Sequence, residues 1–349
     1  MPHLLDNFDD LLSQWCQQQE MPGYRVAQVR RWIFDKRTRD WDTMTDLGKP
    51  LRHSLADQFT LWSTKIDQHT KAADGTEKLL LTLATGGQIE CVLLRDQVRR
   101  TICISTQVGC GMGCVFCASG LDGLQRNLTT GEILEQILRL DRLLSPEERL
   151  THIVVMGIGE PLANLDSLLP ALDEARRPDG LGISPRRITI STVGLPQAMR
   201  RLTQKSSQYR LAVSLHAPND QLRNQLVPVN DKTGLDAILK EADAYFAASG
   251  RQLTFEYVLL GNLNDHPEHA LELAERLGGR TALLNVIPYN PVEGLPYKTP
   301  TAQAQQRFRS ILLKAGIAVK FRHRKGDKID AACGQLRRRV GLQQVQPEV

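Results

Sequence analysis

The alternation of two hydrophobic periodicities restricts the fold of this chain more than any other feature of its sequence. From residue 101 onward, short runs rich in Ile, Val and Leu, typical of buried strands, alternate with longer stretches whose apolar residues recur at helical spacing. The predicted strands span residues 101–106, 152–157, 187–192, 211–216, 253–260, 282–287 and 319–323. The predicted helices include residues 132–144, 165–176, 235–248, 268–277 and 302–315. This alternation predicts parallel strands joined by right-handed helical crossovers.

The number of strand–helix units indicates how far the sheet curls. About six units are present, fewer than the eight of a closed barrel. We therefore predict an α/β fold built on an open (β/α)6 partial barrel over residues 99–335. Thr129 and Glu132 form a capping-box pattern at the start of its first helix. In sheets of this kind, the loops after the C-terminal ends of the strands carry the chemistry.

Three shorter segments flank the predicted barrel. Residues 1–70 carry helical patterns and predict a small N-terminal helical accessory domain. Residues 71–98 predict a β-hairpin extension, because Gly86 and Gly87 separate two runs of β-forming residues. Residues 336–349 form a basic C-terminal tail.

The sequence does not have the features expected of a membrane protein or of an exported protein. No apolar run approaches the roughly 18 residues of a transmembrane helix, so we expect no membrane partner. The N-terminus is acidic and polar and does not resemble a secretory signal, so we expect a cytoplasmic protein. The seven cysteines are then expected to be metal-binding or catalytic thiols rather than a disulfide framework.

Basic residues gather in four runs, although the net charge is only +5. The runs lie at residues 30–31, 99–100, 322–325 and 337–339. Together they suit a phosphate-bearing partner, whereas each run alone is more often an ordinary solvated surface. In residues 1–70, an apolar stripe over residues 28–34 lies beside several basic residues. We interpret this region as an RNA-facing domain and the stripe itself as core packing.

Three cysteines, Cys110, Cys114 and Cys117, follow the first predicted barrel strand in a C-x3-C-x2-C array. A [4Fe–4S] cluster usually takes four thiolates, so three thiolates would leave one iron open to a substrate. A structural zinc site is an alternative, and it would need Cys103 as a fourth ligand. Unrelated thiols are disfavoured because three cysteines lie within eight residues.

Further candidate residues lie at the C-terminal ends of the later predicted strands or just after them, where a bound ligand would lie. They are Gly159 and Glu160 in a glycine-rich turn, Ser191, the run Ser214, Leu215 and His216, and Asn290. Glu160 can accept a hydrogen bond from an ammonium group. The alternatives are a tight turn at Gly159, a core histidine at His216 and an Asn-Pro turn at Asn290.

The chain resembles the RlmN/Cfr family of radical S-adenosylmethionine ribosomal RNA (adenine) methyltransferases, and most of all the RlmN branch. The cysteine spacing with Phe116 before the last cysteine matches the radical S-adenosylmethionine pattern. The other matching segments are residues 24–28, 30–34, 107–120, 157–162, 214–218, 222–230, 287–291 and 326–336. The last segment, which contains Cys333, is the most specific because radical enzymes at large lack it.

This resemblance implies one [4Fe–4S] cluster on the three cysteines of the array and two S-adenosylmethionine molecules per turnover. It implies that the cosubstrate contacts Gly159, Glu160, Ser191, Ser214, Leu215, His216 and Asn290. The expected partners are ribosomal RNA, with transfer RNA as a second candidate, and an electron donor of flavodoxin or ferredoxin type.

The resemblance also implies how an electron-poor ring carbon, carbon 2 of adenine, receives a methyl group. Cys333 would carry the methyl group as an S-methylcysteine intermediate and become joined to the RNA. Cys103 would be the resolving thiol, releasing the product through a transient disulfide with Cys333. Glu90 would accept the proton that leaves the ring. Without the resemblance, Cys103 is a buried strand cysteine and Glu90 a hairpin residue.

Three other functions remain open at this point. The first is methylation at carbon 8 of adenine, as in the Cfr branch. The second is a zinc-stabilised RNA-binding protein without catalysis. The third is a radical enzyme that acts on a small molecule or a protein, although the late cysteine motif and the basic runs argue against it.

Overall fold

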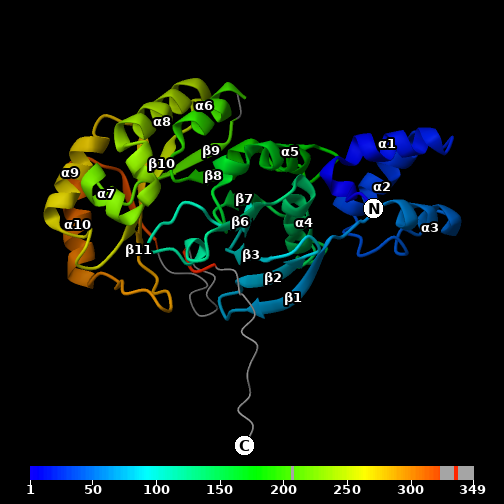
Figure 1. Ribbon diagram of the computed structural model, residues 1–349, viewed down its shortest axis with the longest axis horizontal. Coiled ribbons are helices and arrows are strands. Elements are labelled where there is room, and N and C mark those ends of the chain that lie inside the picture. The colour runs from blue at the N-terminus through cyan, green and yellow to red at the C-terminus, as the bar shows by residue number, and fades with distance from the viewer. Residues whose placement is uncertain (206–207, 323–333, 337–349) are drawn as a thin grey trace, which may run out of the picture.

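The computed structural model describes residues 1–205, 208–322 and 334–336. Within these residues the strands form a ten-stranded sheet in the order β1-β2-β3-β4-β7-β8-β9-β10-β11-β12 (Figure 1). Seven of these strands, from β4 onward, are parallel. They are β4 (Arg100–Cys103), β7 (His152–Val155), β8 (Ile188–Thr192), β9 (Arg210–Ser214), β10 (Leu253–Leu259), β11 (Ala282–Pro288) and β12 (Val319–Phe321).

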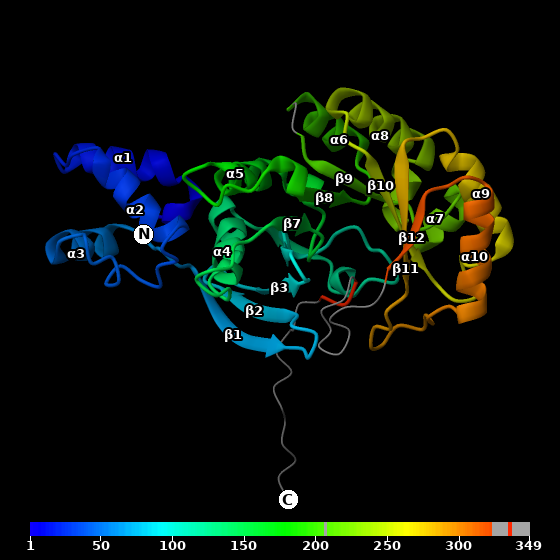
Figure 2. The same cartoon turned by 180° about the vertical axis from the view of Figure 1, so that it is seen from behind.

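Helices connect consecutive parallel strands and lie outside the curved sheet (Figures 1 and 2). They are α4 (Thr130–Asp141), α5 (Leu165–Arg176), α6 (Pro196–Gln204), α8 (Leu235–Ser249), α9 (Pro267–Leu277) and α10 (Ala302–Lys314). A shorter helix, α7 (Asp220–Leu226), precedes α8. In the described part of the chain, β1 and β12 stay at opposite edges and the sheet does not close. The predicted open (β/α)6 partial barrel is therefore confirmed.

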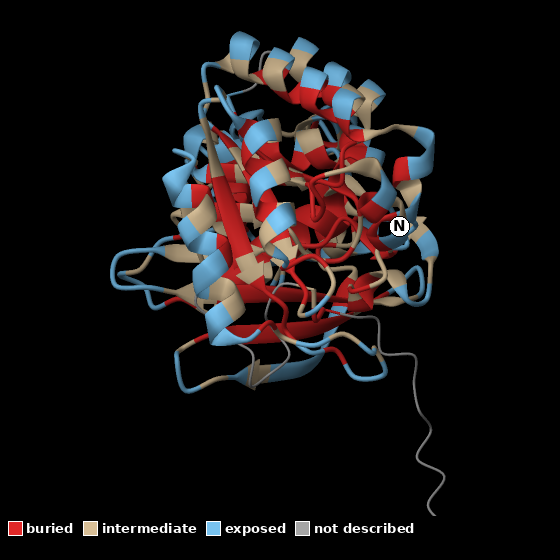
Figure 3. Cartoon of the chain, turned by 90° about the vertical axis from the view of Figure 1, so that its left-hand side faces the viewer, coloured by how far each residue is buried: buried red, intermediate tan, exposed pale blue. Residues whose placement is uncertain are grey.

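The core follows from the hydrophobic pattern of these elements. Figure 3 shows buried residues along the strands and on the inner faces of the helices, while the outer helix faces are exposed. The predicted capping box is present, because Thr129 accepts from the Glu132 amide and Glu132 accepts from the Thr129 amide. The predicted strand 101–106 is shorter than expected, since the chain leaves the sheet after Cys103.

An antiparallel extension joins the barrel at β4. It consists of β1 (Thr64–Lys71), β2 (Glu77–Leu83) and β3 (Gln88–Arg95). The predicted hairpin around Gly86 and Gly87 is present as β2 and β3, and β3 pairs with β4. Strand β1 was not predicted, because Ile66 is the single apolar residue in its mostly exposed sequence TKIDQHTK. Leu79 and Leu81 of β2 belong to the main core, and the opposite face carries Lys78 and Leu80.

The N-terminal helices α1 (Phe8–Gln18), α2 (Tyr24–Phe34) and α3 (Lys49–Gln58) gather at one end of the molecule, beside α4 and α5 (Figures 1 and 2). Arg30 of α2 is buried and bonds to Asp9 of α1 and Glu174 of α5, each at 2.7 Å. One residue of the basic run 30–31 is therefore used to dock this domain rather than to form a free surface.

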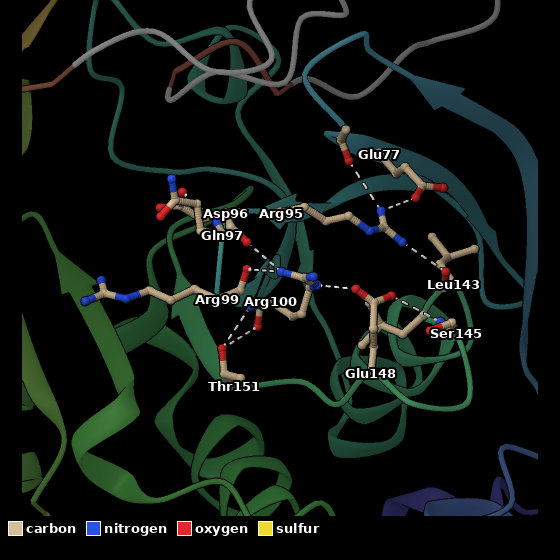
Figure 4. A network of polar contacts seen from close by, with 12 residues as sticks. Glu77, Arg95, Asp96, Gln97, Arg99, Arg100, Leu143, Ser145, Glu148 and Thr151 are labelled. Atoms are coloured by element: carbon tan, nitrogen blue, oxygen red, sulfur yellow. Dashed lines mark hydrogen bonds and ion pairs between the residues drawn. The ribbon is translucent and has the colours of Figure 1, made fainter.

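A second basic run is also partly internal. In Figure 4, Arg100 forms an ion pair with Glu148 and bonds to the Asp96 carbonyl. Arg95 of β3 bridges the Glu77 carboxylate and the Leu143 carbonyl, and so ties the extension to the segment after α4. In residues 99–100, Arg100 thus serves the fold. No helix in the described ranges combines the length and apolar character needed to cross a bilayer.

Glu135 of α4 generates a prediction, because its buried carboxylate fixes the start of β1. It accepts hydrogen bonds from the amides and hydroxyls of Ser63 and Thr64 at 2.7–3.0 Å. We expect Glu135→Gln to lower the free energy of unfolding by about 2 kcal/mol, because charge-assisted bonds are lost and an amide NH2 meets other donors. The measurement is urea denaturation. The matched change at the exposed Glu147 should have little effect, and equal losses for the two variants would contradict the prediction.

Candidate functional site

A cavity at the C-terminal ends of the parallel strands collects nearly all of the predicted ligand-binding residues. Its lining includes Cys110, Cys114, Cys117, Gly159, Glu160, Ser191, Ser214, His216 and Asn290. Leu215 is fully buried behind this lining, where its amide donates to the Glu256 carbonyl. The cavity thus brings together residues from the C-terminal ends of separate strands.

The three cysteines lie on a loop between β5 (Gln107–Gly109) and β6 (Leu124–Asn127), which pair with each other. Gly109 has φ +76°, and a Cβ atom there would lie 2.0 Å from the Gly123 carbonyl oxygen, so only glycine fits. The loop rests on α7, because the Val115 amide donates to the Leu226 carbonyl at 3.1 Å. Local backbone geometry therefore holds the three thiols on one loop that faces the cavity.

The thiols lie in surroundings that disfavour negative charge. Burial raises the pKa of Cys110 to about 12 and also raises the pKa of Cys114 and Cys117. Bound iron would reverse this preference, because metal coordination deprotonates thiols. Three sulfur donors facing a cavity with further polar groups fit a cluster that shares a site with a ligand.

The zinc alternative depends on Cys103 as the fourth donor. Within the described ranges, no group of three or more His, Cys, Asp and Glu side chains is already drawn together around a metal position, and this holds for the three cysteines of the array as well. Cys103 does not line the cavity of the three cysteines and packs instead beside Val92, Ile158 and Leu336. A structural zinc site is closed by four ligands, and Cys103 is not placed to be one of them.

Glu160 is fixed at the junction of two loops. Its Oε1 accepts from the Leu162 amide at 3.0 Å and its Oε2 from the Val193 amide at 2.8 Å. Burial raises the pKa of this carboxyl, while the two amides favour its ionised form. Gly159 has φ +105°, and a Cβ atom there would lie 2.6 Å from the Gln107 side chain. A rigid carboxylate at the cavity wall can accept a ligand ammonium group.

His216 is neutral and locked in place. Its Nδ1 accepts from the Val258 amide at 3.0 Å, so Nε2 carries the proton. Burial and the neighbouring Arg223 lower the pKa of His216 to about 3. Its backbone has φ +62°, and its ring packs edge-to-face on Phe116 at 4.8 Å. His216 is buried, as expected of a core histidine, and it also lines the cavity, as expected of a ligand contact.

Sequence reasoning missed Arg223, which lies under the cysteine loop with no exposed surface. Its guanidinium donates to the carbonyls of Val193, Ser214 and Leu215 and to the Asn230 side chain. Burial lowers its pKa to about 10, so it stays protonated at neutral pH. In the sequence, the segment 222–230 shows only its resemblance to the family, because an arginine between Leu222 and Leu226 looks like an ordinary exposed helix position.

Glu256 of β10 was also missed, although it lines the cavity. Asn285 of β11 donates to its Oε2 at 2.6 Å, and Arg322 donates to Asn285 Oδ1 at 3.1 Å. Arg322 begins the predicted basic run 322–325, and the rest of that run lies outside the described residues. Period-two burial could have placed Glu256 inward, but nothing in the sequence distinguishes it from a solvated glutamate.

Two of the three residues expected to act on the RNA, Glu90 and Cys103, lie on one face of the sheet, outside the cavity lining. Glu90 and Val92 of β3 point to the same side of the sheet, and Val92 lies opposite Cys103 of β4. Glu90 and Cys103 therefore share a face. Cys333 lies outside the described residues. The residue that follows it, Gly334, lines the cavity.

Residues 334–336 lie between the cysteine loop and the face that carries Glu90 and Cys103. The Gly334 carbonyl accepts from the Ala118 amide at 2.9 Å, and the Leu336 carbonyl accepts from the Ser119 hydroxyl at 2.6 Å. Leu336 also packs with Val92 and Ile158, next to Cys103. This short segment thus contacts the cysteine loop on one side and the Glu90–Cys103 face on the other.

Comparisons with known proteins cover nearly the whole chain. Residues 104–274 match the family model of the Radical SAM superfamily, and residues 3–61 match the ribosomal RNA large subunit methyltransferase N-terminal domain. A probable dual-specificity RNA methyltransferase RlmN from Rhodopirellula baltica is 60% identical over 97% of this chain and 91% of that protein. A probable RlmN from Carboxydothermus hydrogenoformans is 42% identical over 97% of this chain and 98% of that protein.

A solved structure agrees with these matches. The crystal structure of a radical SAM methyltransferase from Sphaerobacter thermophilus superposes with a TM-score of 0.93 and 38% sequence identity. The superposition covers 96% of this chain and 99% of that chain. Fold and sequence therefore point to the same group of enzymes.

Arg223 provides a prediction for the site. We expect Arg223→Met to lower the free energy of unfolding by about 3 kcal/mol, because buried carbonyls lose a charged donor. We also expect less iron per chain after anaerobic purification, since the cysteine loop loses its support. Urea denaturation and iron analysis are the measurements. Arg201→Met, at an exposed ion pair with Asp166, should change either value little; the prediction is wrong if both variants behave alike.

Proposed function

Because the chain belongs to the RlmN family of radical S-adenosylmethionine RNA methyltransferases, we propose that it methylates carbon 2 of an adenosine in large-subunit ribosomal RNA. The observation that carries this proposal is the position of residues 334–336, between the cysteine loop and the Glu90–Cys103 face. Related proteins are named as dual-specificity enzymes, which supports transfer RNA as a second substrate.

Membership of this family implies a [4Fe–4S] cluster and S-adenosylmethionine. When bound, they supply the methyl group and the one-electron chemistry that an electron-poor ring carbon requires, and we propose two S-adenosylmethionine molecules per turnover. Cys110, Cys114 and Cys117 would hold the cluster. Glu160 would accept hydrogen bonds from the ammonium group of the cosubstrate, as its fixed carboxylate allows. The remaining contacts would come from Gly159, Ser191, Ser214, Leu215, His216 and Asn290, most of which line the cavity.

The chain's own residues would then transfer the carbon in two stages. Cys333 carries the methyl carbon into a covalent adduct with the RNA base, and Glu90 accepts the proton that leaves ring carbon 2. The Cys103 thiolate attacks the Cys333 sulfur. The sulfur–sulfur bond forms as the carbon–sulfur bond breaks, and the released carbon keeps the electron pair and takes up a proton. The shared face of Glu90 and Cys103 supports both roles.

The proposed arrangement assigns one task to each part of the chain. Residues 1–70 would face the RNA, residues 71–98 would supply Glu90, and residues 99–335 would hold the cofactors. Residues 336–349 would add basic charge for the RNA. A flavodoxin- or ferredoxin-type donor would supply electrons, and the cytoplasm is the compartment that provides such donors and RNA.

The first experiment identifies the product. Anaerobically purified protein is incubated with ribosomal RNA, S-adenosylmethionine and a reductant, and the nucleosides are separated and weighed by mass spectrometry. We expect 2-methyladenosine, and none with Cys333→Ala. A product that is 8-methyladenosine would assign the Cfr-type reaction instead, and the absence of any methylated adenosine would contradict the proposal.

A second prediction tests the resolving thiol. Cys103→Ala should accumulate RNA covalently joined to protein, because the adduct on Cys333 can no longer be released by disulfide formation. The measurement is a slowly migrating, nuclease-sensitive protein band. Cys91→Ala is the matched control, since Cys91 is adjacent to Val92 but belongs to the main core on the opposite face. Equal adduct levels in the two variants would remove Cys103 from this role.

A further inference from the structure

A buried lysine lies beside the proposed proton acceptor. Lys78 Nζ is 2.8 Å from Glu90 Oε1, and the two side chains are only 6% and 3% exposed. We infer that Lys78 is a positioning residue, which compensates the charge of the Glu90 carboxylate and orients it toward the RNA base. This inference rests on the proposed function, because it assigns a task to Lys78 only if Glu90 accepts the ring proton.

Strand register places Lys78 where such a task is possible. Val92 of β3 has Lys78 of β2 as its partner on one side and Cys103 of β4 on the other. Glu90 lies two residues before Val92 and is therefore the diagonal neighbour of both Lys78 and Cys103 on the same face. The ammonium thus contacts the carboxylate, and the thiol lies on the same face across β3, with Leu336 packed on Val92 between the two strands.

The fold alone does not explain a lysine at this position. A buried ion pair costs desolvation, and apolar residues of similar volume often give equal or greater stability. Leu80, which pairs with Glu90 on this same face, is 8% exposed, so the face accommodates an aliphatic side chain. A second leucine and an uncharged partner would satisfy packing, whereas a charged pair satisfies a chemical need.

The chemical need follows from the role of Glu90. A carboxylate that takes a proton from the ring must face it, and a buried carboxylate needs a partner for its charge. An ammonium within hydrogen-bond distance compensates that charge and restricts the carboxylate rotamer. Lys78 is too buried to be an ordinary phosphate contact on the surface, so its charge acts on Glu90 rather than on the RNA backbone.

The test compares Lys78→Met, Lys78→Arg and Glu90→Gln with wild type, and with Lys65→Met as the control. Lys65 is an exposed lysine of β1 in the same antiparallel extension, 81% exposed. The readouts are methylation of Cys333 by peptide mass, formation of 2-methyladenosine, and the kinetic isotope effect with RNA deuterated at carbon 2. The isotope effect reports on proton removal and does not respond to a general loss of folded protein.

We expect Lys78→Met to form S-methyl-Cys333 at the wild-type level but to make 2-methyladenosine about 100-fold more slowly. Its isotope effect should rise above that of wild type, as for Glu90→Gln. Lys78→Arg should recover most of the rate, because it keeps the charge. Lys65→Met should match wild type in every readout.

Other outcomes overturn the inference. It is wrong if Glu90→Gln is slow while Lys78→Met is as fast as wild type, or if Lys78→Met also loses methylation of Cys333. It is equally wrong if Lys78→Arg is no faster than Lys78→Met. Lys78→Gln replaces Lys78→Met if the latter does not fold, and failure of both to fold would reduce the pair to a structural role. A normal rate in Glu90→Gln would instead refute the role of Glu90 in the proposed function.

Discussion

The hydrogen bonds of one buried guanidinium hold together the part of the sheet on which the site is built. Arg223 donates to three carbonyls at the ends of β8 and β9, and to Asn230 after α7. Carbonyls at the C-terminal ends of parallel strands have no further strand to pair with, so they need donors from elsewhere. Because α7 also receives the Val115 amide of the cysteine loop, the same cation links the strand ends to the loop that would hold a cluster.

The second constraint is the pairing of β3 with β4, which merges an antiparallel extension with a parallel barrel. Without it, Glu90 and Cys103 would belong to separate units of the chain. The pairing sets Val92 opposite Cys103, and the period of two then fixes which side chains share the face. A shift of one residue in this register would move Glu90 and Lys78 into the main core and bring Cys91 to their place.

The sequence predicts the elements that have a strong period. Helix α5 has the predicted bounds, and the seven parallel strands lie within a few residues of the predicted ones. The cavity also brings together Glu160, Ser191, Ser214, His216 and Asn290, which the sequence places at the ends of separate strands. Strand β1 escaped prediction because a single apolar residue, Ile66, gives it no alternating pattern, and its position depends on pairing with β2 and on the distant Glu135. Pairing of this kind leaves no local pattern.

Buried charge is the part of the structure that sequence patterns describe worst. Arg30, Lys78, Glu90, Arg223 and Glu256 are all buried, yet each looks in the sequence like a residue exposed to solvent. The exposed alternative is the better expectation for a single charged residue, because burial is favourable only when a specific partner meets it in three dimensions.

The contacts of these buried charged residues differ in what they connect. The partners of Arg30 join the N-terminal helices to the barrel, and those of Arg223 join the strand ends. Lys78 and Glu90 lie on neighbouring strands that backbone hydrogen bonds already hold together, so their ion pair is not needed to connect them. The charges in such a pair are instead available for chemistry on the face that they share with Cys103.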